Sequence, residues 1–331
     1  MPSTSESLHQ FDPSLQSEDI AFALAELIEC QACSRKNAPD RAACIYCGRD
    51  LDNAQATKLT LRKLEGWEPG FSVITRKLPI EQTALNAIAS LLGIEKERLS
   101  EIAEANEPLP IARVESLAAA NALASRIADH GGDCRVLADT DLNAEKSPIR
   151  LKRIDLDVDE VALVDFNTDI VYRVHPNDIS LIVIGRLITS RTDVLEKRRR
   201  GGKSVLLDET STSSDESVTD FYTKDDAFGF RIRLSGFDFS CLDSERQLIA
   251  AQNFRLLIER LRTIATNACV VDYLPVRHFL DDVWEPESRK DAQGRKSAGL
   301  GQKGFGSVAT TNNVGQFTKF SRMHWHLLRS I

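Results

Sequence analysis

Two short cysteine hooks constrain the fold of this chain more than any other feature of its sequence. The first reads Cys30-Gln-Ala-Cys33 and the second reads Cys44-Ile-Tyr-Cys47. A Cys-x-x-Cys spacing turns two thiolates toward one point, so the hooks together supply four sulfurs, the closed tetrahedral set that a structural Zn²⁺ prefers. We therefore expect Cys30, Cys33, Cys44 and Cys47 to bind Zn²⁺. A metal site with no open coordination position folds a segment and does not catalyse a reaction.

The residues around the hooks favour the same interpretation. Gly48 follows the second hook, where a sharp turn needs a positive φ, and Asn37, Pro39 and Asp40 are typical of a turn between the hooks. The pattern resembles the small zinc-ribbon family over 27–51. Two disulfides or a redox pair are the alternatives. A redox Cys-x-x-Cys opens a helix after a strand and needs only one motif, and two disulfides suit a secreted chain.

Composition bounds the class of protein and its compartment. The 331 residues are 42% hydrophobic and 27% charged, as in soluble globular proteins of two or three domains. A net charge of −7 argues against a nonspecific grip on nucleic acid. The seven cysteines include three scattered ones, Cys134, Cys241 and Cys269, which suggests a reducing compartment. Residues 1–19 lack the basic start of a signal peptide, and no apolar run is long enough for a membrane span. We expect a cytoplasmic protein with no membrane segment.

The pattern of hydrophobic residues divides the chain into parts and predicts an α+β fold class. We expect a small zinc ribbon, a βααβαβ domain and a larger C-terminal α+β domain. The boundaries that we predict are a disordered start at 1–19, the ribbon at 20–52, the βααβαβ domain at 70–139 and the C-terminal domain at 149–331, with a flexible stretch at 197–220.

The βααβαβ domain is the most readable of these parts. Apolar residues recur with a period of two in strands and at helical spacing in helices. The elements expected in order are a strand at 71–75, a helix at 84–92 ended by Gly93, a helix at 96–105, a strand at 111–114, a helix at 117–130 opened by Glu115 or Ser116, and a strand at 134–137.

This order carries a second resemblance. The segments Leu91-Leu92-Gly93-Ile94, Pro108-Leu109-Pro110-Ile111 and His130-Gly131-Gly132-Asp133-Cys134-Arg135-Val136 are similar to the C-terminal domain of the bacterial ribosomal stalk protein, over 71–137. In that family a basic helical face after the glycine binds translation factors. The matching stretch here, 95–98, has mixed charge and departs from that pattern. The resemblance implies a compact domain that docks partners through one helical surface.

The C-terminal region is less readable. The strands that we expect are 149–156, 160–166, 170–174 and 228–234, with 179–188 a buried strand or a short helix. We expect three helices. The first begins at a capping box of Ser244 and Gln247 and runs to about Ala265, and the other two cover 276–284 and 314–328. We expect Arg231 and Arg233 to face water from a half-buried strand. The basic run Arg198–Lys203, the acidic run 208–220 and the polar stretch 285–306 read as loops.

Other sequence patterns that suggest chemistry lack the context that the chemistry needs. Residues 299–304 match the letters of a dinucleotide fingerprint but have no buried strand before them and no helix after them. His324 and His326, with Asp281 and Asp282, can ligate a metal if they lie on a strand, but they diverge on the helix that we expect.

A nucleophile and base pair is also discounted. Cys241 and His278 are the candidate pair, but Cys241 lies among apolar residues, where a thiol is usually a small buried hydrophobe. Tyr46, inside the second hook, reads as a local packing residue.

These observations favour a non-catalytic, zinc-binding adaptor of the cytoplasm that docks protein partners. One alternative is an enzyme with a site in 149–331, near Arg231, His278 and Asp281, with 197–220 and 294–306 as lids. The other is a nucleic-acid-binding protein that uses the ribbon and Arg198–Lys203. The sequence does not indicate an oligomeric state.

Overall fold

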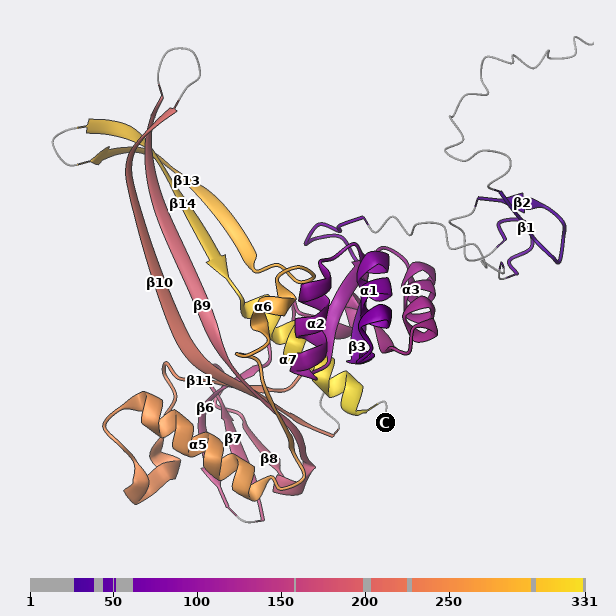
Figure 1. Cartoon of the computed structure of the whole chain (residues 1–331). Coiled ribbons are helices and arrows are strands. Elements are labelled where there is room, and N and C mark those ends of the chain that lie inside the picture. The colour runs from indigo at the N-terminus through magenta and orange to yellow at the C-terminus, as the bar shows by residue number, and fades with distance from the viewer. Residues whose placement is uncertain are drawn as a thin grey trace, which may run out of the picture. The chain divides into compact units, whose positions relative to one another are not determined.

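The computed structural model of the chain describes residues 27–38, 44–49, 51, 62–157, 159–198, 204–224, 228–298 and 302–329, in two compact units, Met1–Thr60 and Leu61–Ile331. The chain mixes helices with strands, as the expected α+β class requires. Most of the described strands join one large curled sheet (Figure 1). The predicted disordered start, 1–19, lies outside the described residues. Among the helices described, none combines the length and the apolar character needed to cross a membrane.

The shorter unit is built around the cysteine hooks. Its strands β1 (Ile28–Glu29) and β2 (Lys36–Asn37) pair antiparallel, with Ile28 opposite Asn37. Its buried cluster consists of Cys30, Cys44 and Leu51, with Cys33 packed against it. Among the described residues of this unit the apolar cluster is small, and a metal ion held by the cysteines would add stability to it.

The longer unit begins with the βααβαβ segment, and the predicted order of its elements is correct. The elements are β3 (Phe71–Lys77), α1 (Gln82–Leu92), α2 (Lys96–Ala105), β4 (Leu109–Val114), α3 (Leu117–Asp129) and β5 (Asp133–Ala138). The strands form an antiparallel sheet in the order β4-β3-β5. Gly93 ends α1 with a φ of 68°, and the Ser116 hydroxyl accepts from the Ala119 amide to cap α3.

A second, nine-stranded sheet forms the rest of the longer unit. Its main path runs β13-β14-β9-β10-β11-β6-β7-β8, and β12 pairs with β9 off this path. The strands are β6 (Ile149–Leu156), β7 (Val161–Asp165), β8 (Val171–Val174), β9 (Ile179–Arg198), β10 (Ser204–Thr223), β11 (Phe230–Arg233), β12 (Cys269–Asp272), β13 (Glu287–Ala298) and β14 (Gln302–Asn312). The predicted hairpin of β7 and β8 is correct.

Two helices cover opposite faces of this sheet (Figure 1). Helix α5 (Ala250–Ile264) places Phe254, Leu257 and Leu261 in a core cluster with strand residues such as Ile182. Helix α7 (Val314–Leu328), predicted at these bounds, packs on the other face and is buried along most of its length. Gly185 of β9 allows the close approach, because a Cβ there would lie 2.5 Å from a ring carbon of Phe317.

The βααβαβ segment packs against the remainder of the same unit. The Trp284 indole donates to the Ser72 hydroxyl at 3.1 Å, and the Arg322 guanidinium of α7 donates to carbonyl oxygens of the turn after α4 (Asp139–Leu142), including Asn143. Arg98 of α2 donates to Asp282 at 3.2 Å. The predicted boundary between 139 and 149 therefore marks a change of sheet inside one compact unit, and its status as a domain boundary stays a prediction.

The loop predicted for the acidic run 208–220 is wrong, because β10 spans Ser204–Thr223, whereas the flexibility predicted for 197–220 stays a prediction. The Ser- and Thr-rich sequence resembles a loop, but β9 supplies backbone partners along the whole strand. Hydroxyl pairs across the ladder, such as Thr192 with Ser211 at 3.4 Å, and the ion pair of Arg186 with Asp215 add to it. Long-range pairing decides the conformation here.

The predicted loop at 285–306 is also wrong over its described part, because β13 and β14 form a hairpin. The glycines that suggested a loop have other roles. Gly294 sits at a bulge of β13 with a φ of 68°, which favours glycine. A Cβ on Gly304 would meet the Glu196 carbonyl oxygen at 2.7 Å, so glycine lets β14 approach β9.

Two details of the predicted helices need correction. Helix α5 begins at Ala250 and not at a Ser244–Gln247 capping box; the side chain of Asn253 instead accepts from the Gln247 amide at 2.6 Å. The predicted helix 276–284 is only the short α6 (Arg277–Leu280). Before α5, the Asn253 side chain bonds both the amide and the carbonyl of Gln247, and this local turn competes with an earlier helix start.

Arg231 does not face water, contrary to prediction. Its guanidinium is buried and donates two hydrogen bonds to Asp220, at 2.6 and 2.7 Å, and one to Thr318 of α7 at 3.0 Å. Alternation along β11 indicated one buried face, but α7 covers the second face as well. Asp220 stands directly opposite Arg231 in the ladder and neutralises its charge.

Candidate metal centre

The structure brings the four predicted ligands together. The sulfur atoms of Cys30, Cys33, Cys44 and Cys47 all lie within 4.8 Å of one another, and no other such cluster occurs among the described residues. The Cys30 and Cys47 sulfurs are 3.7 Å apart, and the Cys33 and Cys44 sulfurs are 3.5 Å apart. All seven cysteines are free thiols, so the hooks are not joined by disulfides. The site is a four-cysteine cluster that can hold a metal ion.

The two hooks have the same backbone geometry. The amide of Cys30 donates to the Arg35 carbonyl at 3.0 Å, and the amide of Cys44 donates to the Arg49 carbonyl at 2.8 Å. The residue after each hook, Ser34 or Gly48, has a positive φ of 54° or 71°. Each hook is therefore a tight turn that presents two sulfurs to the same point, and Gly48 occupies the conformation that the sequence predicts.

Asn37 connects the two hooks, a role that the sequence analysis did not assign to it. Its side chain is buried, its Nδ2 donates to the Cys44 sulfur at 3.4 Å and to the Arg35 carbonyl, and its Oδ1 accepts from the Ile45 amide at 3.0 Å. In the sequence, the only indication of this role is that an Asn lies between the two hooks, and an Asn at such a place is equally typical of a turn.

The thiols of Cys33 and Cys44 differ in acidity. Burial raises the pKa of Cys44, but amide hydrogen bonds from Tyr46 and Cys47 and the Asn37 amide outweigh burial and lower that pKa to about 6. A hydrogen bond with the backbone of Arg35 lowers the pKa of Cys33. Burial and hydrogen bonds with the other three thiols raise this pKa, and the overall value is about 12. The cluster therefore presents at least one ready thiolate to a metal ion, which then displaces the remaining protons.

Replacing Asn37 tests its support of the sulfur cluster. Asn37→Ala is expected to weaken metal binding by about 10- to 100-fold, because groups that orient ligands carry effects of that size. Competition with a chromogenic chelator measures the affinity. Lys36→Ala, at the exposed neighbouring position of β2, is the matched control and is expected to bind metal as the wild type does. Equal affinities for the two variants would contradict this role.

With this geometry, the chain is defined as a mixed α/β protein with a cluster of four cysteines that can hold a metal ion. We found no match of the chain to any family model, curated protein or solved structure. The likeness of 71–137 to the ribosomal stalk domain therefore stays a resemblance of sequence pattern and element order.

The other candidate residues do not assemble into a site. His324 and His326 lie on α7, as expected for a helix: His324 is buried beside Phe320, and His326 lies against the Asp141 carbonyl. Asp281 accepts a hydrogen bond from Gln316, and Asp282 pairs with Arg98. These side chains are engaged in packing and internal hydrogen bonds.

The remaining candidates are also separate. Cys241 lies in a short 3₁₀ helix (Ser240–Glu245), and its backbone carbonyl accepts a hydrogen bond from the Arg260 guanidinium. His278 lies on a different element, α6. Within the described residues no hydrogen bond joins these two side chains. Burial raises the pKa of Cys241 to about 11, which is the opposite of what an activated nucleophile needs. Glycines 299 and 301 of the fingerprint lie outside the described residues, and Gly304 lies in a strand.

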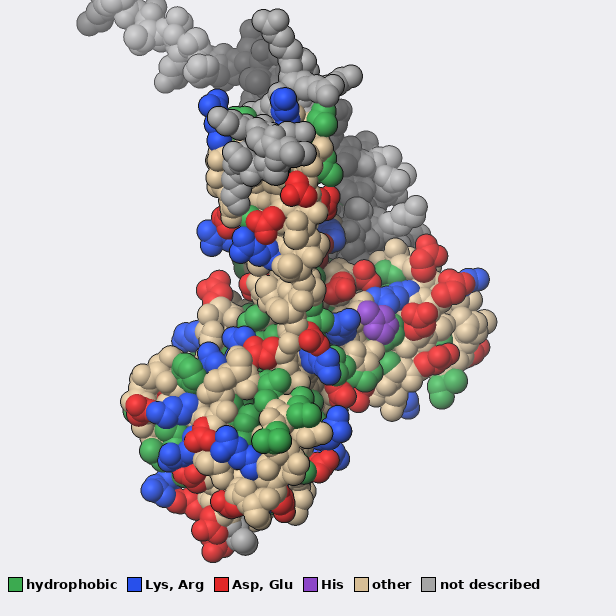
Figure 2. Space-filling model, turned by 90° about the vertical axis from the view of Figure 1, so that its left-hand side faces the viewer, with side chains coloured by type: hydrophobic (Ala, Val, Ile, Leu, Met, Phe, Trp, Pro, Cys, Tyr) green, Lys and Arg blue, Asp and Glu red, His purple; other side chains and the backbone are tan. Residues whose placement is uncertain are grey.

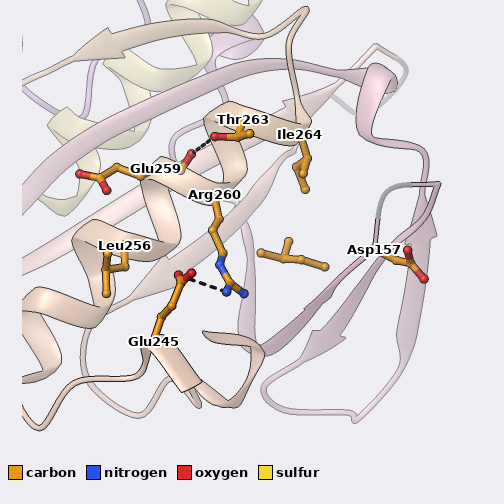
Figure 3. A pocket seen from close by; sticks show the side chains of 8 residues that line it. Asp157, Glu245, Leu256, Glu259, Arg260, Thr263 and Ile264 are labelled. Carbon is orange, nitrogen blue, oxygen red and sulfur yellow. Dashed lines mark hydrogen bonds and ion pairs between the residues drawn. The ribbon is translucent and has the colours of Figure 1, made fainter. Parts of the chain in front are cut away.

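A pocket of about 370 Å³ lies between α5 and the end of β6 (Figure 3). Its lining is Leu156, Asp157, Glu245, Leu256, Glu259, Arg260, Thr263 and Ile264. Arg260 pairs with Glu245 at 3.1 Å, and the Thr263 hydroxyl donates to the Glu259 backbone carbonyl. These eight residues include no Cys, His or Ser, so the pocket offers no nucleophile with a neighbouring imidazole base.

The buried imidazole of His324 makes stability depend on pH. Burial lowers the pKa of His324 from 6.5 to about 3, and its Nε2 has no hydrogen-bond partner. Below pH 6.5 the imidazole binds a proton in the unfolded chain but not in the folded chain. Protonation therefore favours the unfolded state, and the folded state loses stability as the pH falls below 6.5. We expect the contribution of His324 to lower the free energy of unfolding of the chain by about 2 kcal/mol between pH 8 and pH 5.

Urea titrations at several pH values measure this effect. His324→Phe removes the group and is expected to flatten the pH dependence by that amount between pH 8 and pH 5. Carboxylates contribute equally to both proteins, so the difference between them isolates the imidazole. Parallel pH curves for the two proteins would show that His324 is not buried in its neutral form.

Proposed function

We propose that this chain is a cytoplasmic, non-catalytic, zinc-stabilised adaptor that docks protein partners. The carrying observation is the closed cluster of four sulfurs, with two exposed apolar side chains on the second hook. Ile45 and Tyr46 are 54% and 50% exposed. A structural metal that holds such a pair in place stabilises a contact surface.

Zinc is the metal that suits this donor set best. A tetrahedral Zn²⁺ with sulfurs at about 2.3 Å separates those sulfurs by about 3.8 Å. The separations of 3.7 and 3.5 Å in the cluster are close to this value. Four thiolates in a reducing compartment favour zinc over calcium or magnesium, which prefer oxygen ligands. The hooks and the paired strands β1 and β2 support assignment of 20–52 as a zinc ribbon.

The surface of the second hook suits a protein partner. Tyr46 was expected to pack locally, but it is half exposed, and the Arg35 guanidinium lies 4.7 Å from its ring centre. Tyr and Arg are among the residues enriched where proteins bind most tightly, and Ile45 adds exposed apolar area beside them. A partner with an apolar patch and an acidic rim fits this surface.

The test is a quantitative capture experiment with the full-length, zinc-loaded chain as bait. The double variant Ile45→Ser with Tyr46→Ser is expected to lose the specific partners while it keeps its metal. Leu248→Ser with Ile249→Ser is the matched control, because this pair on the longer unit is also apolar and is even more exposed. Recovery of the same proteins with both variants, or recovery of none with the wild type, would overturn the proposal.

The two alternative functions have less support. For nucleic-acid binding, the side chains of Arg198–Lys203 lie outside the described residues, and the described face in Figure 2 shows acidic and basic side chains interspersed. For an enzyme, Arg231 and Asp281 are held by internal hydrogen bonds. A shift of RNA or DNA at low salt, or a turnover assay that finds activity, would favour these alternatives.

A further inference from the structure

Two open sheet edges of the longer unit point to contact between copies of this chain. The hairpins β9–β10 and β13–β14 extend together, away from α5 and α7, as a four-stranded antiparallel arm in the order β13-β14-β9-β10 (Figure 1). Strand β11 pairs with β10 only over Val218–Phe221. Among the described strands, β10 before residue 217 therefore has only β9 as a partner, and β13 has only β14. The backbone along both outer edges is available for pairing.

The two edges carry opposite charge. We define the acidic edge as residues 205–215 of β10 and the basic edge as residues 288–295 of β13. The acidic edge contains Asp208, Glu209 and Asp215 and has no Lys or Arg, and Asp215 is already paired with Arg186 of β9. The basic edge contains Arg289, which is paired with Asp291 at 2.9 Å, and the further cations Lys290 and Arg295. From 208 to 215 and from 288 to 295 every side chain is exposed.

This charge pattern selects one kind of pairing. Charged residues on an edge strand normally prevent uncontrolled association, because like charges across a ladder are destabilising. Two acidic edges or two basic edges repel each other in this way. An acidic edge and a basic edge attract, so the arm discourages both symmetric pairings and permits the unlike one.

We propose that the acidic edge of one copy pairs with the basic edge of a second copy and extends the sheet. Neighbouring strands are antiparallel across the whole arm, so a second copy in the same orientation places its β13 antiparallel to β10 of the first. Such a contact uses two different surfaces and leaves one of each free. Repetition of a contact of this type without closure produces an open chain of copies.

Residues at matching levels of the arm support this arrangement. Leu206, Glu196, Phe305 and Arg295 form one row across the four strands, and Leu206 and Phe305 are 54% and 45% exposed. In the same row, Leu206 of one copy falls opposite Arg295 of the next, and Phe305 of that copy lies one strand further in, about 10 Å away. Glu209 falls opposite Ala292 of the next copy, with Lys290 diagonal to it and within reach of a long side chain.

Charge reversal on each edge tests the proposal. Sedimentation velocity of the wild-type chain is expected to show association that grows with concentration and weakens with salt. The acidic-edge variant, Asp208→Lys with Glu209→Lys, and the basic-edge variant, Lys290→Glu with Arg295→Glu, are each expected to associate at least tenfold more weakly. All four positions are exposed, and a thermal melt checks that both variants fold.

An equal mixture of the two variants gives the decisive result. One variant has two positive edges and the other has two negative edges, so unlike edges meet only when the variants are mixed. The mixture is expected to recover the association of the wild type. A wild-type chain that stays monomeric at every concentration, or a mixture that recovers nothing, overturns the proposal. Capture of partners by Ile45 and Tyr46 is a separate measurement and does not affect this result.

A pair of cysteines identifies the contact itself. Glu209→Cys with Ala292→Cys is expected to give a ladder of disulfide-linked multimers on a non-reducing gel, and neither single variant is expected to do so. The two positions stand on opposite edges of one arm, about 14 Å apart at three strand spacings, so they cannot form a disulfide within one copy. A double variant without a ladder contradicts pairing in this register.

Discussion

Cys44→Ser is expected to abolish metal binding and to unfold the shorter unit while the longer unit keeps its melting temperature. The apparent binding energy of structural zinc is about 10–16 kcal/mol in small zinc modules, and in such modules it is also the folding energy. The apolar cluster among the described residues of the shorter unit, formed by Cys30, Cys44 and Leu51, is too small to replace it. Elemental analysis measures the metal, and limited proteolysis measures the order of the segment 27–51.

Two observations bear on how to interpret that variant. Cys134→Ser is the control, because this thiol is remote in sequence from the hooks and belongs to β5 of the longer unit. It is expected to leave one metal ion per chain. If Cys44→Ser also unfolded 62–329, the two units would not be independent, and the division of the chain into a metal module and a separate body would be incorrect.

Arg231→Met is expected to lower the free energy of unfolding of the longer unit by about 3–5 kcal/mol. The substitution leaves the carboxylate of Asp220 without its partner, in a position where its side chain has no solvent exposure. It also removes the hydrogen bond from Arg231 to Thr318, which joins the sheet to α7. Urea denaturation followed by circular dichroism measures the loss.

The double variant Asp220→Leu with Arg231→Met separates the pair from its environment. Removal of both charges from a buried pair is often neutral, so this variant is expected to recover most of the stability. Arg191→Met is the surface control: its pair with Asp193 is exposed and is worth less than about 1 kcal/mol. A double variant as unstable as Arg231→Met would show that the loss comes from packing and not from the unpaired charge.

Local sequence signals were enough wherever a segment forms its own contacts. The elements from β3 to β5 could be predicted because each helix carries its own apolar face and its own stop, such as Gly93. The clustering of the four cysteine sulfurs could also be predicted, since the Cys-x-x-Cys spacing alone places two sulfurs together. That this cluster binds a metal ion, and that the ion is zinc, stays a prediction, because the same four sulfurs accept other soft metals.

Prediction failed where a distant segment supplies the contact. The outer part of β10 and the hairpin of β13 and β14 read as loops because their Ser, Thr and Gly residues carry no apolar alternation, and only pairing with β9 makes them strands. The hydrogen bond from Asn37 to the Cys44 sulfur likewise forms only because the folded hooks bring these two residues together.

The sequence by itself determined the sulfur cluster and the short elements with their own hydrophobic periodicity. Only the tertiary structure decided that Arg231 is buried and that a long arm extends from the sheet. The physical reason is that hydrogen bonds along a β-ladder and burial beneath a helix depend on residues far away in the chain, so neither can be read from a short stretch of sequence.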